Sequence, residues 1–211
     1  MHAHELRAYA NSMMVFLFYL TFHIFTNDFG LLKNISKASA DAATILIAIT
    51  LLLGPLSRFF SKHFRHDLIY RKPIGIAGVF FAVLHVIVAF VNTYNADLVY
   101  MYNPASPNFF AVIFCTLSIL VLAISAVTST KGAVKKLGFK KWKTLQRTAY
   151  IAILFGAIHF SLVGNGYFLR TTTGKALLGL VIIALAAKIV VILLNKKKTH
   201  SKLEKDYLTK K

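Results

Sequence analysis

The sequence predicts an all-α membrane protein: a single domain of six transmembrane helices with both termini on the cytoplasmic side. Two compositional features point to a membrane. Of the 211 residues, 57% are hydrophobic and only 15% are charged, and the mean hydropathy is +0.63. Soluble domains carry about 45–50% apolar and about 25% charged residues. A third feature, the clustering of basic residues between alternate apolar stretches, gives the expected orientation.

Six apolar stretches are long enough to cross about 30 Å of hydrocarbon, which takes about 20 helical residues. They cover residues 8–26, 41–60, 74–94, 109–129, 147–164 and 175–195. The first is expected to remain as a helix, because charges of both signs precede it and no A-x-A-like cleavage site directly follows it. Turn-forming residues 103–108 precede the fourth stretch, and Gly164, Asn165 and Gly166 follow the fifth. Residues 1–211 are therefore expected to form one domain, ending in a basic tail at residues 196–211.

Lysine and arginine gather in three segments on one predicted side, at residues 58–72, 131–147 and 196–211. The opposite loops carry Lys33, Lys37, Arg170 and Lys175. Because cytoplasmic loops hold the excess of Lys and Arg, both termini are expected in the cytoplasm. Topology and contact with anionic membrane lipid account for the net charge of +18. No nucleic-acid partner is expected.

Three histidines lie inside predicted spans: His23, His85 and His159. Ionisable residues inside a span are costly and are therefore functional candidates. His85 lies eleven residues past Ile74, and His159 lies twelve past Arg147, on helices that both run outward. At about 1.5 Å per residue, both imidazoles are expected about 17–18 Å from the cytoplasmic boundary. His23 lies nearer the outer surface with no partner expected at its height, and an interfacial role is expected for it.

Two imidazoles at one height on facing helices can hold the iron of a haem between them. Zinc fits less well, because it needs three or four protein ligands and neither a third ligand nor a carboxylate is expected at this depth. Small residues that leave room for a planar ring share the two histidine faces: Gly75, Gly78, Ala82 and Ala89 beside His85, and Ala152 and Gly156 beside His159. The expected iron ligands are His85 and His159. The small residues expected at the cofactor are Gly78, Ala82 and Gly156.

Two other interpretations of this pattern stay open. Small residues also allow close helix packing in membranes without any cofactor, and each histidine can simply hydrogen-bond a neighbouring helix. The one cysteine, Cys115, excludes an intramolecular disulfide framework. It lies in an apolar run without a nearby His or Asp, so an inert buried thiol is expected.

The order of several short motifs resembles the ferric-reductase-like transmembrane family, and most closely its MsrQ branch, the haem-binding membrane subunits of bacterial protein-methionine-sulfoxide reductases. The motifs in the first half are residues 54–58 (GPLSR), 70–75 (YRKPIG) and 84–85 (LH). Those in the second half are residues 128–130 (TST), 136–138 (KLG), 141–142 (KW), Leu145, Tyr150 and 158–160 (IHF). Together they cover roughly residues 50–165.

This resemblance implies a multi-pass b-haem protein of the bacterial inner membrane, with His85 and His159 at the family's ligand positions. It implies a cytosolic flavin reductase or membrane quinol as electron donor, and a periplasmic molybdopterin reductase subunit as acceptor. The protein would then be a redox subunit rather than a self-contained enzyme. At Gln146 the branch usually carries histidine; an amide is a poor haem ligand, so one haem b is expected and a second lacks its usual ligand.

The inner half of the membrane is expected to hold a further electron carrier, FMN or a quinone, near Arg71, Trp142, Gln146 and Arg147. The guanidinium group of arginine presents several N–H donors that suit phosphate or carbonyl oxygens, and an aromatic side chain can stack on a planar ring. The alternative is that these residues are interface anchors, as Trp and Arg at helix ends commonly are.

Three other functions are weighed against a methionine-sulfoxide reductase subunit. One is a ferric-reductase-type oxidoreductase that acts on metal ions or oxygen. Another is a small proton-coupled transporter with intramembrane histidines, which would favour further acidic residues in the spans. An intramembrane hydrolase using Ser161 ranks last, since no Asp supports a pair with His159 and no G-x-S-x-G motif is present.

Overall fold

The computed structural model describes residues 3–27 and 29–208, and all regular structure in this part of the chain is helical. Its long helices are α1 (Ala3–Thr26), α2 (Leu31–Phe59), α4 (Arg71–Tyr94), α6 (Phe109–Val127), α9 (Ala149–Leu162) and α11 (Thr172–Leu208). The short ones are α3 (Ser61–Phe64), η1 (His66–Tyr70), α5 (Leu98–Met101), α7 (Lys131–Leu137), α8 (Phe139–Arg147), η2 (Val163–Gly166) and α10 (Tyr167–Arg170). Within these described ranges, six helical segments are long and apolar enough to cross a membrane, which confirms the predicted all-α bundle.

The second span begins earlier than the sequence predicts. Residues 27–40 are expected as an outer loop, but α2 already begins at Leu31. Its polar residues look like loop residues in the sequence, yet the helix accommodates them: Ser39 Oγ donates to the carbonyl of Ile35 at 2.8 Å, and Asn34, Ser39 and Asp41 are buried. Likewise α11 runs without interruption into the predicted basic tail; residues 209–211 of that tail lie outside the described part of the chain.

The turns between helices use the residues that the sequence singles out. The 3-10 helix η2 follows α9, and inside it Gly164 and Asn165 adopt left-handed conformations with φ of 58° and 54°. Asn95, which ends α4, also adopts a left-handed backbone conformation, with φ of 50°. The carboxamide oxygen of Asn108, just before α6, accepts from the backbone N–H of Gly164 at 3.1 Å. This bond joins the beginning of α6 to the end of α9.

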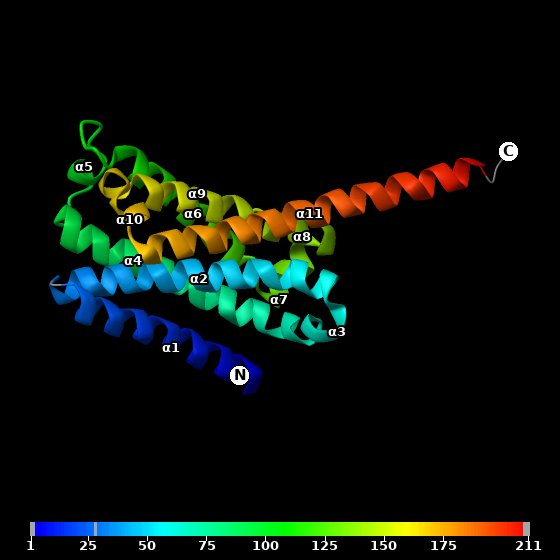
Figure 1. The fold of residues 1–211 in the computed structure, drawn as a ribbon, viewed down its shortest axis with the longest axis horizontal. Helices are drawn as coiled ribbons and strands as arrows, with labels where there is room; N and C mark the ends of the chain where they lie inside the picture. Colours follow the sequence, from blue (N-terminus) through cyan, green and yellow to red (C-terminus); the bar gives the residue numbers. More distant parts are fainter. Residues whose placement is uncertain (1–2, 28, 209–211) are drawn as a thin grey trace.

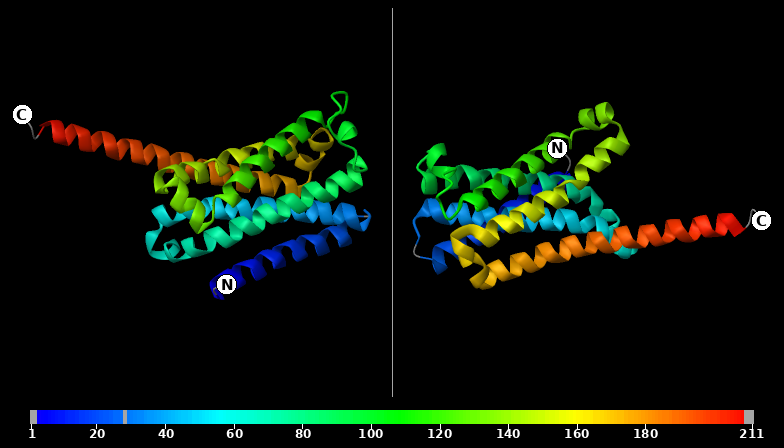
Figure 2. Two further views of the ribbon diagram at one scale, coloured as in Figure 1. Left: turned by 180° about the vertical axis from the view of Figure 1, so that it is seen from behind. Right: turned by 90° about the horizontal axis from the view of Figure 1, so that it is seen from above.

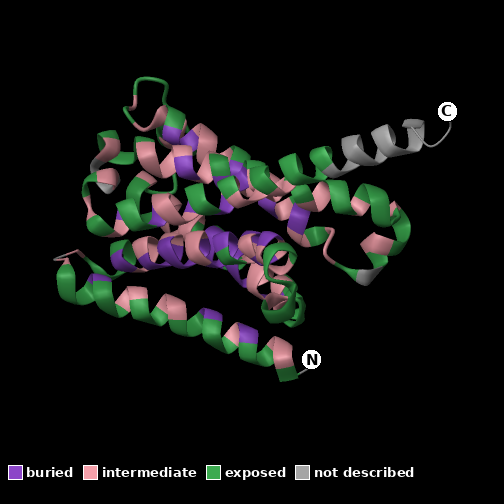
Figure 3. Ribbon diagram, turned by 45° about the vertical axis from the view of Figure 1, so that its right-hand side comes forward, coloured by how far each residue is buried: buried purple, intermediate pink, exposed green. Residues whose placement is uncertain are grey.

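Helix α2 forms the centre of the bundle. It packs against α1, α4, α9 and α11, while α6 packs against α9 and α4. Buried positions gather along α2, and exposed positions dominate the outward faces of the other helices (Figure 3). Many of those outward residues are large and apolar, among them Phe18, Phe25, Phe80, Leu120 and Ile183. An apolar exterior around a packed centre is what a lipid environment requires.

Both ends of the described chain point toward the same end of the bundle. Helix α1 begins there and α11 extends beyond it, and α3, α7 and α8 lie at the same end (Figures 1 and 2). The basic segments at residues 58–72 and 131–147 fall within or beside these short helices. One end of the bundle is therefore strongly basic, and the loop with α5 and the α9–α11 turn lies at the other.

Candidate functional site

The structure brings His85 of α4 and His159 of α9 together inside the bundle. Their ring centres lie 6.1 Å apart and their planes meet at 65°. Both side chains line one partly open cavity, bounded by residues of α2, α4, α6, α9 and α11. The sequence predicts equal depth for the two imidazoles, and the contact between the rings agrees with that depth.

The spacing of the two rings suits two ligands on opposite sides of one metal ion. A metal–imidazole bond is about 2 Å long and the ring centre lies roughly 1.1 Å behind the nitrogen, so opposed imidazoles have centres about 6.2 Å apart. Among the described residues no group of three His, Cys, Asp or Glu could hold a metal ion. An ion held by these two histidines therefore needs its remaining ligands from elsewhere, as iron obtains them from a porphyrin.

Each imidazole is oriented by a backbone carbonyl on a neighbouring helix. His85 Nδ1 lies 2.8 Å from the carbonyl oxygen of Ser36 on α2, and His159 Nδ1 lies 2.8 Å from that of Ala111 on α6. Because a carbonyl can only accept, Nδ1–H is the donor on both rings. Nε2 then carries the lone pair, which is the arrangement that a metal-binding histidine requires.

The sequence gives no signal for these two acceptors, since any residue type offers a backbone carbonyl. Ser36 in particular lies in the segment that is expected to be a loop. Only the early start of α2 places its carbonyl beside α4. The acceptors are therefore a product of helix packing, and the structure is needed to find them.

The small residues around the histidines divide between two roles. Ala82 and Gly156, two of the small residues expected at the cofactor, line the cavity. Gly78 instead faces α2, because a Cβ there would lie 2.8 Å from Ile47 Cγ1. The structure therefore places Gly78 at the close contact of α2 with α4, not among the residues that line the cavity. Cys115 also lines this cavity.

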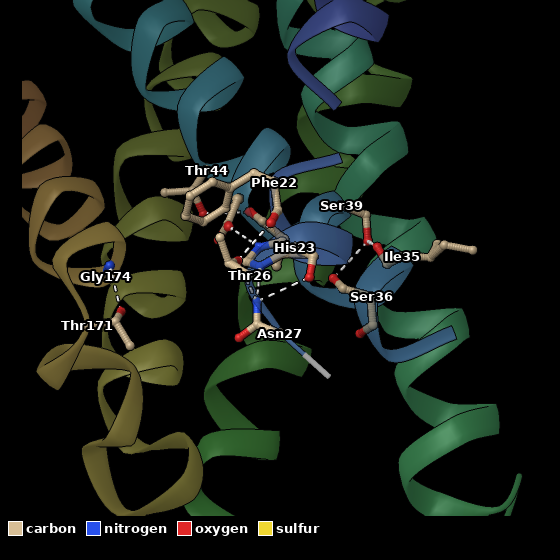
Figure 4. Close-up of polar contacts among 12 residues, drawn as sticks. Phe22, His23, Thr26, Asn27, Ile35, Ser36, Ser39, Thr44, Thr171 and Gly174 are labelled. Atoms are coloured by element: carbon tan, nitrogen blue, oxygen red, sulfur yellow. Dashed lines mark hydrogen bonds and ion pairs between the residues drawn. The ribbon is translucent and has the colours of Figure 1, made fainter. Parts of the chain in front are cut away.

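His23 has a partner that the sequence does not predict. Its Nε2 lies 2.8 Å from Asp41 Oδ2, and the Asn27 amide nitrogen lies 3.1 Å from its Nδ1, at the junction of α1 and α2 (Figure 4). Asp41 also lines the cavity of His85 and His159. The expectations of no carboxylate inside the spans and of no partner for His23 are both wrong, because α2 continues outward past Asp41 and carries it into the bundle.

A second cavity lies next to the first. Three residues of the predicted carrier site line it, Arg71, Trp142 and Gln146, while Arg147 is not among its lining residues. The side chains of Ile47 and Leu122 line both cavities and form a shared wall. The two cavities together thus extend from the histidines toward the basic end of the bundle.

The second cavity is more polar than the first. The hydroxyls of Thr50 and Ser125 line it, are fully buried and have no hydrogen-bond partner among the described residues. Buried hydroxyls without partners are costly, so a bound molecule with polar atoms would satisfy them. The Gln146 amide nitrogen is already engaged, because it donates to the carbonyl of Ser125 at 2.9 Å and to Thr128 Oγ1 at 3.1 Å. Trp142 Nε1 donates to the Thr128 carbonyl at 3.0 Å.

The fold and the site together define a multi-pass membrane protein that holds a pair of histidines in the core of its helical bundle. Residues 39–157 match the model of the ferric reductase like transmembrane component. This is more than half of the chain, and the chain belongs to that family. The matched segment includes His85 and the second cavity; His159 lies two residues beyond its end.

Several bacterial proteins are similar to this chain. The heme-binding subunit MsrQ of protein-methionine-sulfoxide reductase from Herminiimonas arsenicoxydans is 27% identical over 144 residues, 68% of this chain and 63% of that protein. MsrQ from Deinococcus radiodurans is 31% identical over 128 residues, 61% of each chain. The magnetosome protein MamZ from Magnetospirillum gryphiswaldense is 33% identical over 96 residues, 46% of this chain and 15% of MamZ. The matches thus span less than two thirds of each of these relatives.

The six apolar helices and the family place the chain among multi-pass proteins of the bacterial inner membrane. The resemblance inferred from the short motifs is confirmed by the family match and by the MsrQ relatives.

Proposed function

We propose that this protein is a membrane redox subunit that binds one haem b between His85 and His159 and passes electrons across the membrane. The observation that carries this proposal is the pair of imidazoles with ring centres 6.1 Å apart, each with Nδ1 bonded to a carbonyl. The MsrQ relatives, which are named as heme-binding subunits, support it.

The chain's own residues fit such a group. His85 and His159 offer Nε2 as iron ligands, and the carbonyls of Ser36 and Ala111 hold the rings in that tautomer. Ala82 and Gly156 leave the faces of the cavity open, and the apolar side chains around them exclude water. A haem bound there supplies reversible one-electron transfer, which no side chain in the cavity offers.

We assign the second cavity to the molecule that delivers electrons from the cytoplasmic side, FMN or a quinol. The Arg71 guanidinium suits phosphate or carbonyl oxygens, and the unpartnered hydroxyls of Thr50 and Ser125 offer further polar contacts. Gln146 stands where the MsrQ branch usually carries histidine, and its amide nitrogen is bonded to the end of α6. This cavity therefore favours an organic carrier over a second haem.

The proposed partners follow from this direction of transfer. A cytosolic flavin reductase or membrane quinol would donate electrons at the basic end of the bundle. A periplasmic molybdopterin subunit of a methionine-sulfoxide reductase would accept them at the other end, in line with the name of the MsrQ relatives. A ferric-reductase-type activity toward metal ions or oxygen, which the family name suggests, is the closest alternative.

One observation favours a second candidate, a small proton-coupled transporter. Asp41 and His85 line one cavity, and His23 is bonded to Asp41. A buried carboxylate beside histidines is typical of intramembrane proton relays. This candidate requires no chromophore.

Absorption spectroscopy distinguishes the two functions. The full chain, purified in detergent from cells that make haem, is expected to show a Soret band that sharpens and shifts on dithionite reduction. Its pyridine haemochrome is expected to be of type b. His85→Ala and His159→Ala should each abolish the band, whereas His63→Ala, at an exposed position in α3, should leave it unchanged. A colourless wild-type protein that folds normally would overturn the haem proposal and leave the transporter.

A further inference from the structure

Lys37 is positioned at the cavity of the two histidines by its place on α2. It directly follows Ser36, whose carbonyl accepts the His85 Nδ1–H bond, and it lines the same cavity. Among the described residues that line this cavity, Lys37 alone carries a positive charge. A cation at the edge of a largely apolar cavity in a membrane is costly unless it meets a negative partner; Asp41 is the carboxylate among the described residues that line this cavity.

The charged groups near Lys37 leave its ammonium available for such a partner. Asp41, one turn further along α2, is the carboxylate nearest in sequence, and its Oδ2 is bonded by His23. The Lys37 ammonium lies 4.1 Å from the centre of the Phe29 ring, and in the described part of the chain it forms no ion pair. A hydrogen bond to a charged group is stronger than a cation–π contact at an exposed site. A carboxylate in the cavity would therefore draw the flexible lysine from the ring.

Haem carries two propionate carboxylates on one edge, and in a low-dielectric site each needs a cation or several hydrogen bonds. We propose that Lys37 binds a haem propionate and so fixes the haem with its carboxylate edge toward the outer end of α2. This inference rests on the proposed function. It makes Lys37 a binding residue that selects a dicarboxylate porphyrin over a neutral one, and it lies outside the segment that matches the family model.

Lys33 is a matched control on the same helix. Its ammonium lies 3.9 Å from the centre of the same Phe29 ring, yet it is not among the residues that line the cavity. Lys33→Gln and Lys37→Gln therefore remove the same charge and the same kind of ring contact, one turn apart. Only the second removes a cation from the cavity.

The test is a titration of haem-free full-length protein in detergent with two porphyrins, haem and its dimethyl ester, followed by the Soret band. The ester keeps the iron and the ring but has no carboxylate. We expect the wild type to bind the ester about tenfold more weakly than haem, as the loss of one charge-assisted contact predicts. Lys37→Gln should bind haem about tenfold more weakly than the wild type and the ester with unchanged affinity. Lys33→Gln should behave as wild type, and Lys37→Arg should restore haem affinity.

Two results would overturn the assignment: wild-type protein that binds both porphyrins equally, or Lys37→Gln that weakens both to the same extent. The wild-type comparison needs no variant and so does not depend on how Lys37→Gln folds. Both results presuppose a Soret band that depends on His85 and His159. Failure of the Lys37 contact is thereby distinguishable from failure of haem binding itself.

Discussion

His23 Nε2 donates to Asp41 Oδ2 at 2.8 Å, and this bond joins α1 to α2. The two residues are only 5% and 2% exposed. Asn27 donates to the other ring nitrogen of His23, so the imidazole is satisfied on both sides. The bond ties the first span to the helix that forms the centre of the bundle.

Removal of either partner should destabilise the protein. Asp41→Ala leaves a buried imidazole N–H without an acceptor, and His23→Ala leaves a buried carboxylate without a donor. Each should lower the free energy of unfolding by about 2–3 kcal/mol, and the double variant should lose clearly less than the sum. Unfolding in detergent can be followed through the fluorescence of Trp142, the one tryptophan.

The control for this pair is Asp97→Ala, which removes the side-chain cap of the short outer helix α5. It should lower the free energy of unfolding by only about 1 kcal/mol. Strictly additive losses at residues 23 and 41 would show that the bond contributes nothing.

Gly78 is expected to tolerate no side chain. In Gly78→Ala the added methyl would lie 2.8 Å from Ile47 Cγ1 and 3.3 Å from the Ile47 backbone nitrogen. Forcing α2 and α4 apart should cost about 1–3 kcal/mol, measured as a lower denaturation temperature in the same detergent. Gly179→Ala in α11 is the control, because nothing lies within 4 Å of a Cβ there. That variant should be neutral or stabilised by up to about 1 kcal/mol. Equal behaviour of the two variants would refute the close packing.

Arg71 is predicted to act in electron delivery and not in haem retention. Arg71→Ala should leave the haem content unchanged but slow haem reduction by reduced FMN or a soluble quinol about tenfold, as loss of one charge-assisted contact implies. Stopped-flow absorbance at the Soret band measures the rate, and dithionite reduction gives a reference. Arg147→Ala should have a smaller effect, because Arg147 is not among the residues that line the second cavity. Unchanged rates in Arg71→Ala would remove this cavity from the pathway.

The orientation predicted from the basic segments can be tested with reporter fusions. A fluorescent protein fused after residue 197 should fold and fluoresce, because it would lie in the cytoplasm. Alkaline phosphatase inserted between residues 103 and 108 should be active, because that loop would lie in the periplasm. The reciprocal fusions should be inactive, and the opposite pattern would invert the proposed direction of electron flow.

Long-range hydrophobic patterning made much of this protein predictable from its sequence. The six spans follow from apolar runs of sufficient length, and the turn at Gly164 and Asn165 follows from residues that tolerate left-handed backbone. The pairing of His85 with His159 follows from counting residues along two helices of the same direction. These inferences succeed because a bilayer fixes helix length and depth, which a soluble fold does not.

Features that depend on how helices face one another were not predictable. A polar run such as residues 34–40 is predicted as a loop unless its partners are known, so the beginning of α2 is predicted ten residues too late. Gly78 and Gly156 look alike in sequence, but one faces α2 and the other faces the cavity, because a residue's face is decided by the rotation of its helix. The carbonyls of Ser36 and Ala111 carry no sequence signature at all.

Helix α2 bears, along a single rod, the carbonyl that orients His85, the lysine at the first cavity, the carboxylate that holds α1, and Ile47 in the wall between the two cavities. A small translation or rotation of α2 would weaken the hydrogen bond between His85 Nδ1 and the Ser36 carbonyl. The same movement would change the shape of the second cavity. The orientation of His85 and the shape of the second cavity are therefore coupled through α2.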